Sequence, residues 1–479
     1  MFKERIKSSI IFILILNLLF LTSQLWFVNS GTTVGEEFSR YLRSFPIIEK
    51  FFPLEPEYSI SKENLSMPRR FLINDGSLWM AYYNTDIGFS PIDRRTREII
   101  KGFLEGDITG KKKIDSETWK AGLESFSIYV EYPVSFSTEM FCRIMGTDED
   151  DAPGEISSLR EFVIIPSSDE SNVCILVKDS KDPNLAYAYI MNNQYSLPVA
   201  DLSVYTSNDG YYEPAFSTGL DLESYGSATL SPLVLFSDSQ PKVEILQPTN
   251  LINNITRGAL LENFSLSSLG INSYEDSEGA TKYIANYSQA IIYPDSIFEY
   301  SSVSDDKGLL LDESGDSFSV LNASIDFAEK TWGCVSEEPL SILVSGDLSS
   351  YNSDQEYVFK FDYYRHGRPI QINLPAQYGH NPMDCAIEIT VKGGRLISYR
   401  QYMRSYQTVS EEIISDSFIS ALDNFINELS VSQAPVIIND IYIGYLDIGK
   451  KDNIKACWIA STDDDNLHLY DAESEANQQ

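Results

Sequence analysis

The feature that most constrains this chain is a single long apolar run close to its first residue. Residues 10–28 are apolar except for Asn17, Thr22, Ser23 and Gln24. A run of this length is enough to cross the hydrocarbon core of a bilayer as one helix. We therefore expect residues 10–28 to form a transmembrane helix, so that the rest of the chain folds outside the bilayer.

The charges on either side of this run predict its orientation. Three basic residues and one acid lie in the first seven positions, whereas Glu36 and Glu37 follow the run. Because basic flanks stay in the cytoplasm, we expect residues 1–9 to be cytoplasmic. The chain from about Gly31 onward is then extracellular, held at the cell membrane by one helix. Cleavage after Ser30, as in a signal peptide, is the alternative.

One face of the predicted helix carries two amide side chains. Asn17 and Gln24 are seven residues apart, which places them on the same face as Ile10 and as Phe20 or Leu21. Amides in lipid usually bond to another helix, for roughly 0.6–2 kcal/mol per contact. This face predicts association with a second membrane helix, and pairing of two copies is left open. Alternatively, Gln24 reaches the interface and Asn17 is tolerated alone.

The composition describes a folded, strongly acidic protein. Hydrophobic residues make up 43% of the 479 residues, and the net charge is −34. A field of this sign repels phosphate backbones, so we expect no nucleic-acid partner. The length is sufficient for several domains.

Motifs that would carry chemistry are missing or incomplete. The three histidines and five cysteines have no zinc-ligand spacing, and the nucleophile-elbow and phosphate-loop patterns are absent. An S-x-x-K pattern occurs at Ser59 and at Ser304 without the K-T-G that accompanies it in penicillin-binding enzymes. We therefore expect no catalysis, no cofactor and no metal. An extracellular enzyme with a polar pocket is an alternative, as is one disulfide among otherwise buried thiols.

The hydrophobic periodicity predicts an α+β fold with mainly antiparallel sheets. Helices are expected at 91–103, 115–123, 318–331 and 409–429. Strands are expected at 70–74, 78–84, 126–132, 162–166, 173–178, 186–191, 340–345, 357–364, 368–373, 385–391, 396–403, 436–445 and 455–460. Shifts in composition divide the extracellular region into an N-terminal α+β domain at 35–195, a middle domain at 196–315, a C-terminal α+β domain at 316–462 and an acidic tail at 463–479.

A basic, aromatic cluster stands out in this acidic chain. Arg365, His366 and Arg368 follow two tyrosines and surround a glycine. They could receive an anionic partner at an interaction surface. A β-turn between paired strands is the alternative interpretation.

Several segments together resemble the YycH (WalH) family of regulatory proteins of Gram-positive bacteria. The resemblance covers the whole chain, more loosely from 104 to 280, and its motifs are structural. They are the basic start at 3–7, the end of the span at 21–26, the helix 321–330 into Thr331-Trp332-Gly333, the segments 357–361 and 367–370, the hairpin segment 386–394, and 441–445 before Ala456-Cys457-Trp458.

The resemblance implies a role in signal transduction. Members of this family regulate the sensor histidine kinase WalK (YycG) of the WalRK two-component system. They act with YycI through transmembrane and extracellular contacts and control cell-wall metabolism. The C-terminal domain at 316–462 resembles YycI. The alternative is an extracellular envelope binding or scaffold protein with another partner.

Overall fold

The structure is a computed structural model that describes residues 65–470 with gaps. Residues 1–64 and 471–479 lie outside the description. So do 66, 77, 84–88, 167–171, 183, 193, 196, 198–212, 215–227, 232, 237–241, 267–271, 286, 334–340, 347, 349–355, 366, 415–416, 430–435 and 463–466. The chain divides into two units, 1–57 and 58–479, and every described residue belongs to the second.

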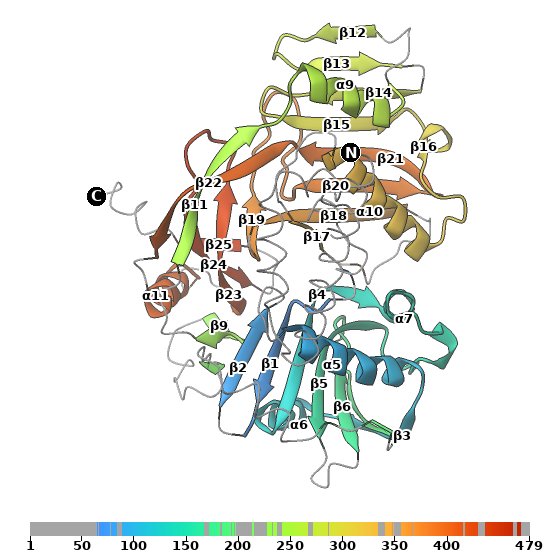
Figure 1. Cartoon of the computed structure of the whole chain (residues 1–479), viewed down its shortest axis with the longest axis vertical. Helices are drawn as coiled ribbons and strands as arrows, with labels where there is room; N and C mark the ends of the chain where they lie inside the picture. Colours follow the sequence, from blue (N-terminus) through green and yellow to red (C-terminus); the bar gives the residue numbers. More distant parts are fainter. Residues whose placement is uncertain are drawn as a thin grey trace, which may run out of the picture. The chain divides into compact units, whose positions relative to one another are not determined.

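The first sheet has seven antiparallel strands in the order β2-β1-β4-β5-β6-β7-β3 (Figure 1). Its strands are β1 (Arg70–Asn74), β2 (Trp79–Tyr83), β3 (Ile108–Ile114), β4 (Ser127–Ser137), β5 (Ser158–Pro166), β6 (Val173–Lys178) and β7 (Ala186–Met191). Its helices are α5 (Phe89–Leu104), α6 (Ser116–Glu124) and α7 (Thr138–Met145), and a 3-10 turn, η1 (Glu149–Asp151), follows.

Both faces of this sheet are covered by apolar packing. Successive side chains of a strand point to opposite sides, so neighbouring residues of β4 show the two faces. Ile128 and Val130 of β4 pack in one apolar cluster with Ile99 of α5. Tyr129, between them, packs in another cluster with Trp119 of α6. The two faces of the sheet therefore carry different helices.

The second sheet has fourteen strands and is antiparallel except where β23 pairs with β19 and β9. Its main path runs β12-β13-β14-β15-β21-β20-β18-β19-β23-β24-β25 (Figure 1). The first strands are β9 (Ala228–Leu230), β12 (Asn272–Glu275), β13 (Thr281–Ile284), β14 (Ser288–Ile292), β15 (Ile297–Ser302) and β16 (Leu309–Leu310). The others are β17 (Ser341–Ser345), β18 (Glu356–Arg365), β19 (Arg368–Ile372), β20 (Ile387–Lys392), β21 (Arg395–Tyr402), β23 (Val436–Asp447), β24 (Ala456–Thr462) and β25 (Leu467–Tyr470).

Three helices pack on this sheet. They are α9 (Asn254–Asn263), α10 (Ser317–Gly333) and α11 (Phe418–Leu429), and a 3-10 turn, η3 (Asp305–Lys307), precedes α10. Ile325 of α10 lies in the same apolar cluster as Tyr399 of β21. Phe425 of α11 lies in a second cluster with Trp458 of β24.

Two small pairs complete the described structure. One joins β8 (Glu213–Pro214) to β10 (Leu235–Phe236), and the other is a ribbon of β11 (Lys242–Asn250) and β22 (Arg404–Ile413). The ribbon corrects the predicted helix at 409–429, since residues up to 413 are a strand paired with β11 and the helix begins at Phe418.

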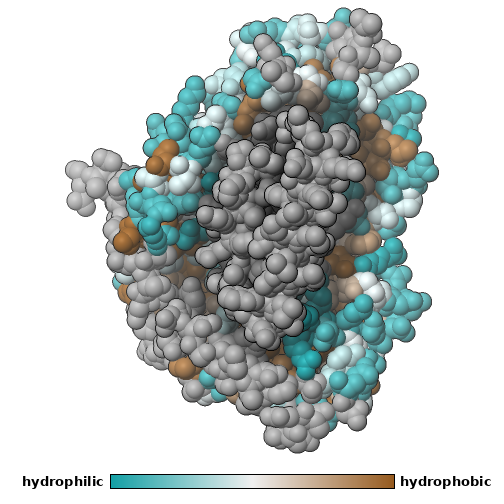
Figure 2. Space-filling view, in the orientation of Figure 1, coloured by the Kyte–Doolittle hydropathy of each residue, from teal (hydrophilic) through white to brown (hydrophobic). Residues whose placement is uncertain are grey.

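The predicted fold class is confirmed in its coarse form, a mixed α+β fold with mainly antiparallel sheets. Strands from the predicted middle domain, β12 to β16, pair into the same sheet as strands from the predicted C-terminal domain, while β25 falls within the expected tail. The domain boundaries stay a prediction. On the face seen in Figure 2, the described surface is mainly hydrophilic, with apolar side chains in small patches.

The predicted transmembrane helix at 10–28 lies outside the described residues. Within the part of the chain that is described, no helix is long and apolar enough to cross a membrane.

Candidate functional site

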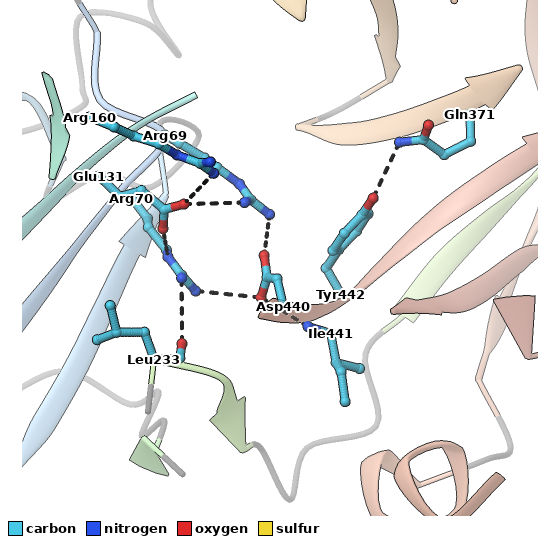
Figure 3. Close-up of polar contacts among 9 residues, drawn as sticks. All are labelled: Arg69, Arg70, Glu131, Arg160, Leu233, Gln371, Asp440, Ile441 and Tyr442. Atoms are coloured by element: carbon cyan, nitrogen blue, oxygen red, sulfur yellow. Dashed lines mark hydrogen bonds and ion pairs between the residues drawn. The ribbon is translucent and has the colours of Figure 1, made fainter. Parts of the chain in front are cut away.

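A group of five charged side chains, three of them buried, joins the two sheets. We call it the charge cluster, and its members are Arg69, Arg70, Glu131, Arg160 and Asp440 (Figure 3). Arg70 opens β1 and lies opposite Glu131 of β4 in the register of the first sheet. Asp440 comes from β23 of the second sheet, at a shift in the register between β23 and β24. The cluster thus draws on strands far apart in sequence.

The contacts form a continuous chain of ion pairs. Arg70 Nε lies 2.5 Å from Glu131 Oε2, and Arg69 Nη2 lies 2.5 Å from Asp440 Oδ2. Two longer contacts cross-link these pairs, Arg69 to Glu131 at 3.5 Å and Arg70 to Asp440 at 3.7 Å. Arg160 Nη2 adds a third guanidinium, 3.1 Å from Glu131 Oε1. Each carboxylate therefore faces at least two arginines.

Arg70, Glu131 and Asp440 are largely removed from water, which makes their charges depend on each other, whereas the side chains of Arg69 and Arg160 are about a third exposed. The side chains of Arg70 and Glu131 are 3% and 5% exposed. Burial alone would raise the pKa of Glu131, but the positive charges of Arg70, Arg69 and Arg160 outweigh burial and lower it to about 2. Burial opposes the positive charge of Arg70, yet Glu131 and Asp440 raise the pKa of its guanidinium well above the ordinary value.

Uncharged groups contact both Arg69 and Arg70. The Arg69 guanidinium lies over the ring of Tyr442 in β23, 5.5 Å from its centroid. Gln371 of β19 donates a hydrogen bond to the Tyr442 hydroxyl at 3.3 Å, and Arg70 donates to the Leu233 carbonyl at 3.4 Å (Figure 3). These contacts fix the orientation of both arginines.

The arrangement suits mechanical coupling. Arginines stay protonated and offer no nucleophile, whereas separating a buried ion pair leaves unpaired charges, at a cost of about 3–5 kcal/mol. Movement of β23 away from β1 would expose several of these charges to water or leave them buried without a partner. The charge cluster is therefore a candidate two-state contact between the sheets.

A backbone contact between the first sheet and the segment that follows β17 lies at the far end of β4. Phe136 and Leu348 form a parallel β-bridge. Close by, Arg143 of α7 pairs with Asp316, just before α10, at 3.0 Å. Among the described residues, the first sheet therefore contacts the rest of the chain through this backbone bridge and ion pair as well as through the charge cluster.

The predicted interaction surface bonds to the β11–β22 ribbon. Arg365 Nη2 donates to Thr408 Oγ1 at 3.3 Å, and Arg368 Nη2 donates to the Lys242 carbonyl at 3.0 Å. His366 lies outside the described residues, and the interaction role of the three stays a prediction. The predicted helix face of Ile10, Asn17, Phe20, Leu21 and Gln24 also lies outside the described residues.

One group of side chains has metal-ligand composition. One ligand atom each from Asp384, Cys385 and Glu388 lies within 4.8 Å of the others. However, Lys360 Nζ is 2.8 Å from Asp384, and Arg400 is 3.7 Å from Glu388. Both carboxylates therefore already have a cationic partner.

The S-x-x-K pattern in the described residues lies on an exposed 3-10 turn. The Ser304 hydroxyl donates to Asp306 at 2.7 Å, and Lys307 pairs with the same carboxylate at 3.1 Å. Serine and lysine thus bind a shared acid. Ser59 and Lys62 lie outside the described residues.

The described cysteines are not joined in disulfides. Cys142 and Cys385 are buried, and Cys174 and Cys457 are partly exposed. Cys334 lies outside the described residues.

Sequence reasoning missed the charge cluster. The available signal was the pair of adjacent arginines at 69 and 70, at the start of a predicted strand in an acidic chain. Their partners Glu131 and Asp440 lie 61 and 371 residues away. No spacing rule reaches that far, so the acids could not be matched to the arginines.

The comparisons with known proteins support the fold that the resemblance implied. No protein-family model matches the chain, and no curated protein matches its sequence. Among solved structures, the fold is similar to the crystal structure of YycH from Bacillus subtilis, with a TM-score of 0.53 over 87% of this chain and 98% of that chain. The two sequences are 13% identical. The chain has a YycH-like fold.

Proposed function

We propose that this chain is a non-enzymatic, membrane-anchored regulator of a sensor histidine kinase of the WalK (YycG) type. In this proposal it acts with a YycI-like partner and controls cell-wall metabolism. The observation that carries the proposal is the YycH-like fold, which spans 87% of this chain. Residues 1–9 are then cytoplasmic, 10–28 span the membrane, and the described residues are extracellular.

In this proposal the signal passes through the spanning helix or through extracellular contacts. A regulator that binds two kinase conformations unequally shifts their populations. A difference of about 1–3 kcal/mol changes the ratio between them about 5- to 150-fold.

The charge cluster gives the extracellular region a way to take part. Because Asp440 belongs to β23 and Glu131 to β4, a partner that bound one arrangement of the two sheets more tightly would favour paired over separated charges. The charge cluster would then transmit a change in the position of one sheet to the other.

The proposal is tested by purifying the tagged full-length chain from membranes of its native host and identifying co-purified proteins by mass spectrometry. Asn17→Leu/Gln24→Leu removes the predicted polar helix face. Thr22→Leu is a matched control, because it also replaces a polar residue by leucine but lies on a different helix face.

The outcomes separate the two candidate functions. We expect a sensor kinase and a second single-pass protein to co-purify with the native chain and the Thr22→Leu control. Recovery should be weaker with the double variant. Recovery of wall-synthesis enzymes alone, unchanged in the double variant, would contradict regulation and favour an envelope scaffold.

A further inference from the structure

Among the strands that the structure describes, the outermost strand of the second sheet has an open edge. β12 is the first strand in the sheet order, and its pairing partner is β13 on one side (Figure 1). All four residues of β12 are exposed, including Tyr274 at 50%. β20, in the interior of this sheet, alternates between buried and half-buried side chains, whereas β12 is exposed on both faces. The strand therefore extends beyond the packed core.

The register identifies the backbone groups that face outward. The Asp276 N–H donates to the Ala280 carbonyl at 3.0 Å, so this pair is hydrogen-bonded across the hairpin. In an antiparallel ladder such pairs alternate with non-hydrogen-bonded ones. Tyr274 opposite Lys282 is then a bonded pair. Ser273 and Glu275 consequently direct their N–H and C=O groups away from β13, toward solvent.

Another edge strand of the same protein carries protection that β12 lacks. β3, at the edge of the first sheet, contains Lys111, Lys112 and Lys113, and its pairing with β7 is shifted between Ile108 and Gly110. Lysines and irregular pairing are common means of preventing a further strand from adding. The β12 sequence, Asn-Ser-Tyr-Glu, has no lysine, proline or register shift.

The surroundings of the open edge are acidic. Glu275, Asp276 and Glu278 lie in β12 and its turn, and Lys282 is the one base of the hairpin from 272 to 284. Lys282 is already paired with Asp276 at 3.0 Å. Among the described residues, no base lies within ion-pair distance of Glu275 or Glu278. An incoming segment with lysine or arginine would supply the missing charge.

We propose that β12 is a docking edge for an extended, basic segment of another protein, which adds to the sheet as a further strand. Main-chain hydrogen bonds to Ser273 and Glu275 supply affinity, and the acidic turn selects for basic side chains. A second copy of this chain fits less well, because it would place two identical acidic hairpins side by side in a protein of net charge −34. The inference does not depend on which kinase, if any, the chain regulates.

The test uses the full-length chain in lipid nanodiscs and a labelled peptide of about eight alternating lysine and valine residues. The control peptide replaces each lysine by glutamate. Ser273→Pro removes one outward N–H and leaves the bonds to β13 intact. Ser273→Ala is the matched control, since it keeps that N–H.

Fluorescence anisotropy should show the basic peptide binding at least tenfold more tightly than the acidic one. Ser273→Pro should weaken binding at least tenfold, and Ser273→Ala should not. In the native chain, amide hydrogen exchange should slow at Ser273 and Glu275 when the basic peptide is added, and stay unchanged at Tyr274. Equal binding of the two peptides, or no change at Ser273 and Glu275, would overturn the proposal. If the Ser273 and Glu275 amides are already protected from exchange without peptide, and this protection is lost when the protein is diluted, the edge pairs with a second copy of the chain instead.

Discussion

Replacing Glu131 by glutamine tests whether the charge cluster holds the fold together. The pKa of Glu131 is lowered from 4.5 to about 2, because three arginines outweigh its burial. At about 1.4 kcal/mol for each pKa unit, this difference corresponds to ~3 kcal/mol of stability from the ionised carboxylate. Glutamine keeps the shape of the side chain and removes the charge. We expect Glu131→Gln to lower the free energy of unfolding by that amount at pH 7.

The pH dependence of the same variant gives an independent check. An acid with a lowered pKa in the folded state stabilises the fold above its unfolded pKa, and this contribution is lost as the pH falls through the folded pKa. The native chain should therefore lose its advantage over Glu131→Gln between about pH 5 and pH 2. At pH 3 the difference should be less than half of its value at pH 7. Urea unfolding followed by tryptophan fluorescence measures both.

Glu161 supplies a matched control of opposite sign. It lies opposite Glu131 in the register of β4 and β5, and burial together with the negative charge of Glu131 raises its pKa. Its ionised form is therefore unfavourable, so Glu161→Gln should leave the fold equally or more stable at pH 7. If Glu131→Gln and Glu161→Gln behave alike, or if the Glu131→Gln effect does not change with pH, the electrostatic reasoning is refuted.

Three further predictions concern the second sheet. Arg404→Leu should lower stability by about 3–5 kcal/mol in urea unfolding, since it leaves Asp447, 1% exposed, without the bonds that Arg404 makes at 2.6 and 2.8 Å. Gly394→Ala should reduce the yield of folded protein, measured by gel filtration, because φ is +72° and a Cβ atom would lie 2.0 Å from the Asp312 carbonyl oxygen. Asp362→Asn should stabilise the fold, and more at pH 8 than at pH 5, because burial raises the pKa of this carboxyl to about 7. An acid with a raised pKa loses stability as the pH rises toward the folded pKa, so equal effects at both pH values would contradict the assignment.

Local patterns were sufficient for much of the secondary structure. The segments 173–178 and 186–191 were predicted as strands and have those bounds as β6 and β7. Helix α6 lies within one residue of its predicted range, because Asp115 caps it by accepting a hydrogen bond from the Thr118 N–H. In both cases the determining residues are neighbours in the sequence.

The sequence-based predictions fail where a segment distant in sequence determines the local structure. Residues 409–413 were predicted as the start of a helix, because Ile413 and Ile414 continue the apolar stripe of the helix that begins at Phe418. They form a strand since β11 pairs with them, and Ile413 is 61% exposed. The charge cluster could not be predicted from the sequence for the same reason, because its two acids lie on strands far along the chain from the two adjacent arginines. Tertiary pairing overrides a local pattern in this way.

We propose that this chain alters the activity of a sensor kinase through its membrane helix. The most direct measurement is the autophosphorylation rate of the native host's co-purified sensor kinase in proteoliposomes, with the full-length chain, with the Asn17→Leu/Gln24→Leu variant, or with neither. We predict that the native chain changes the rate several-fold and that the double variant loses most of this effect. A rate that is the same in all three preparations would contradict the account.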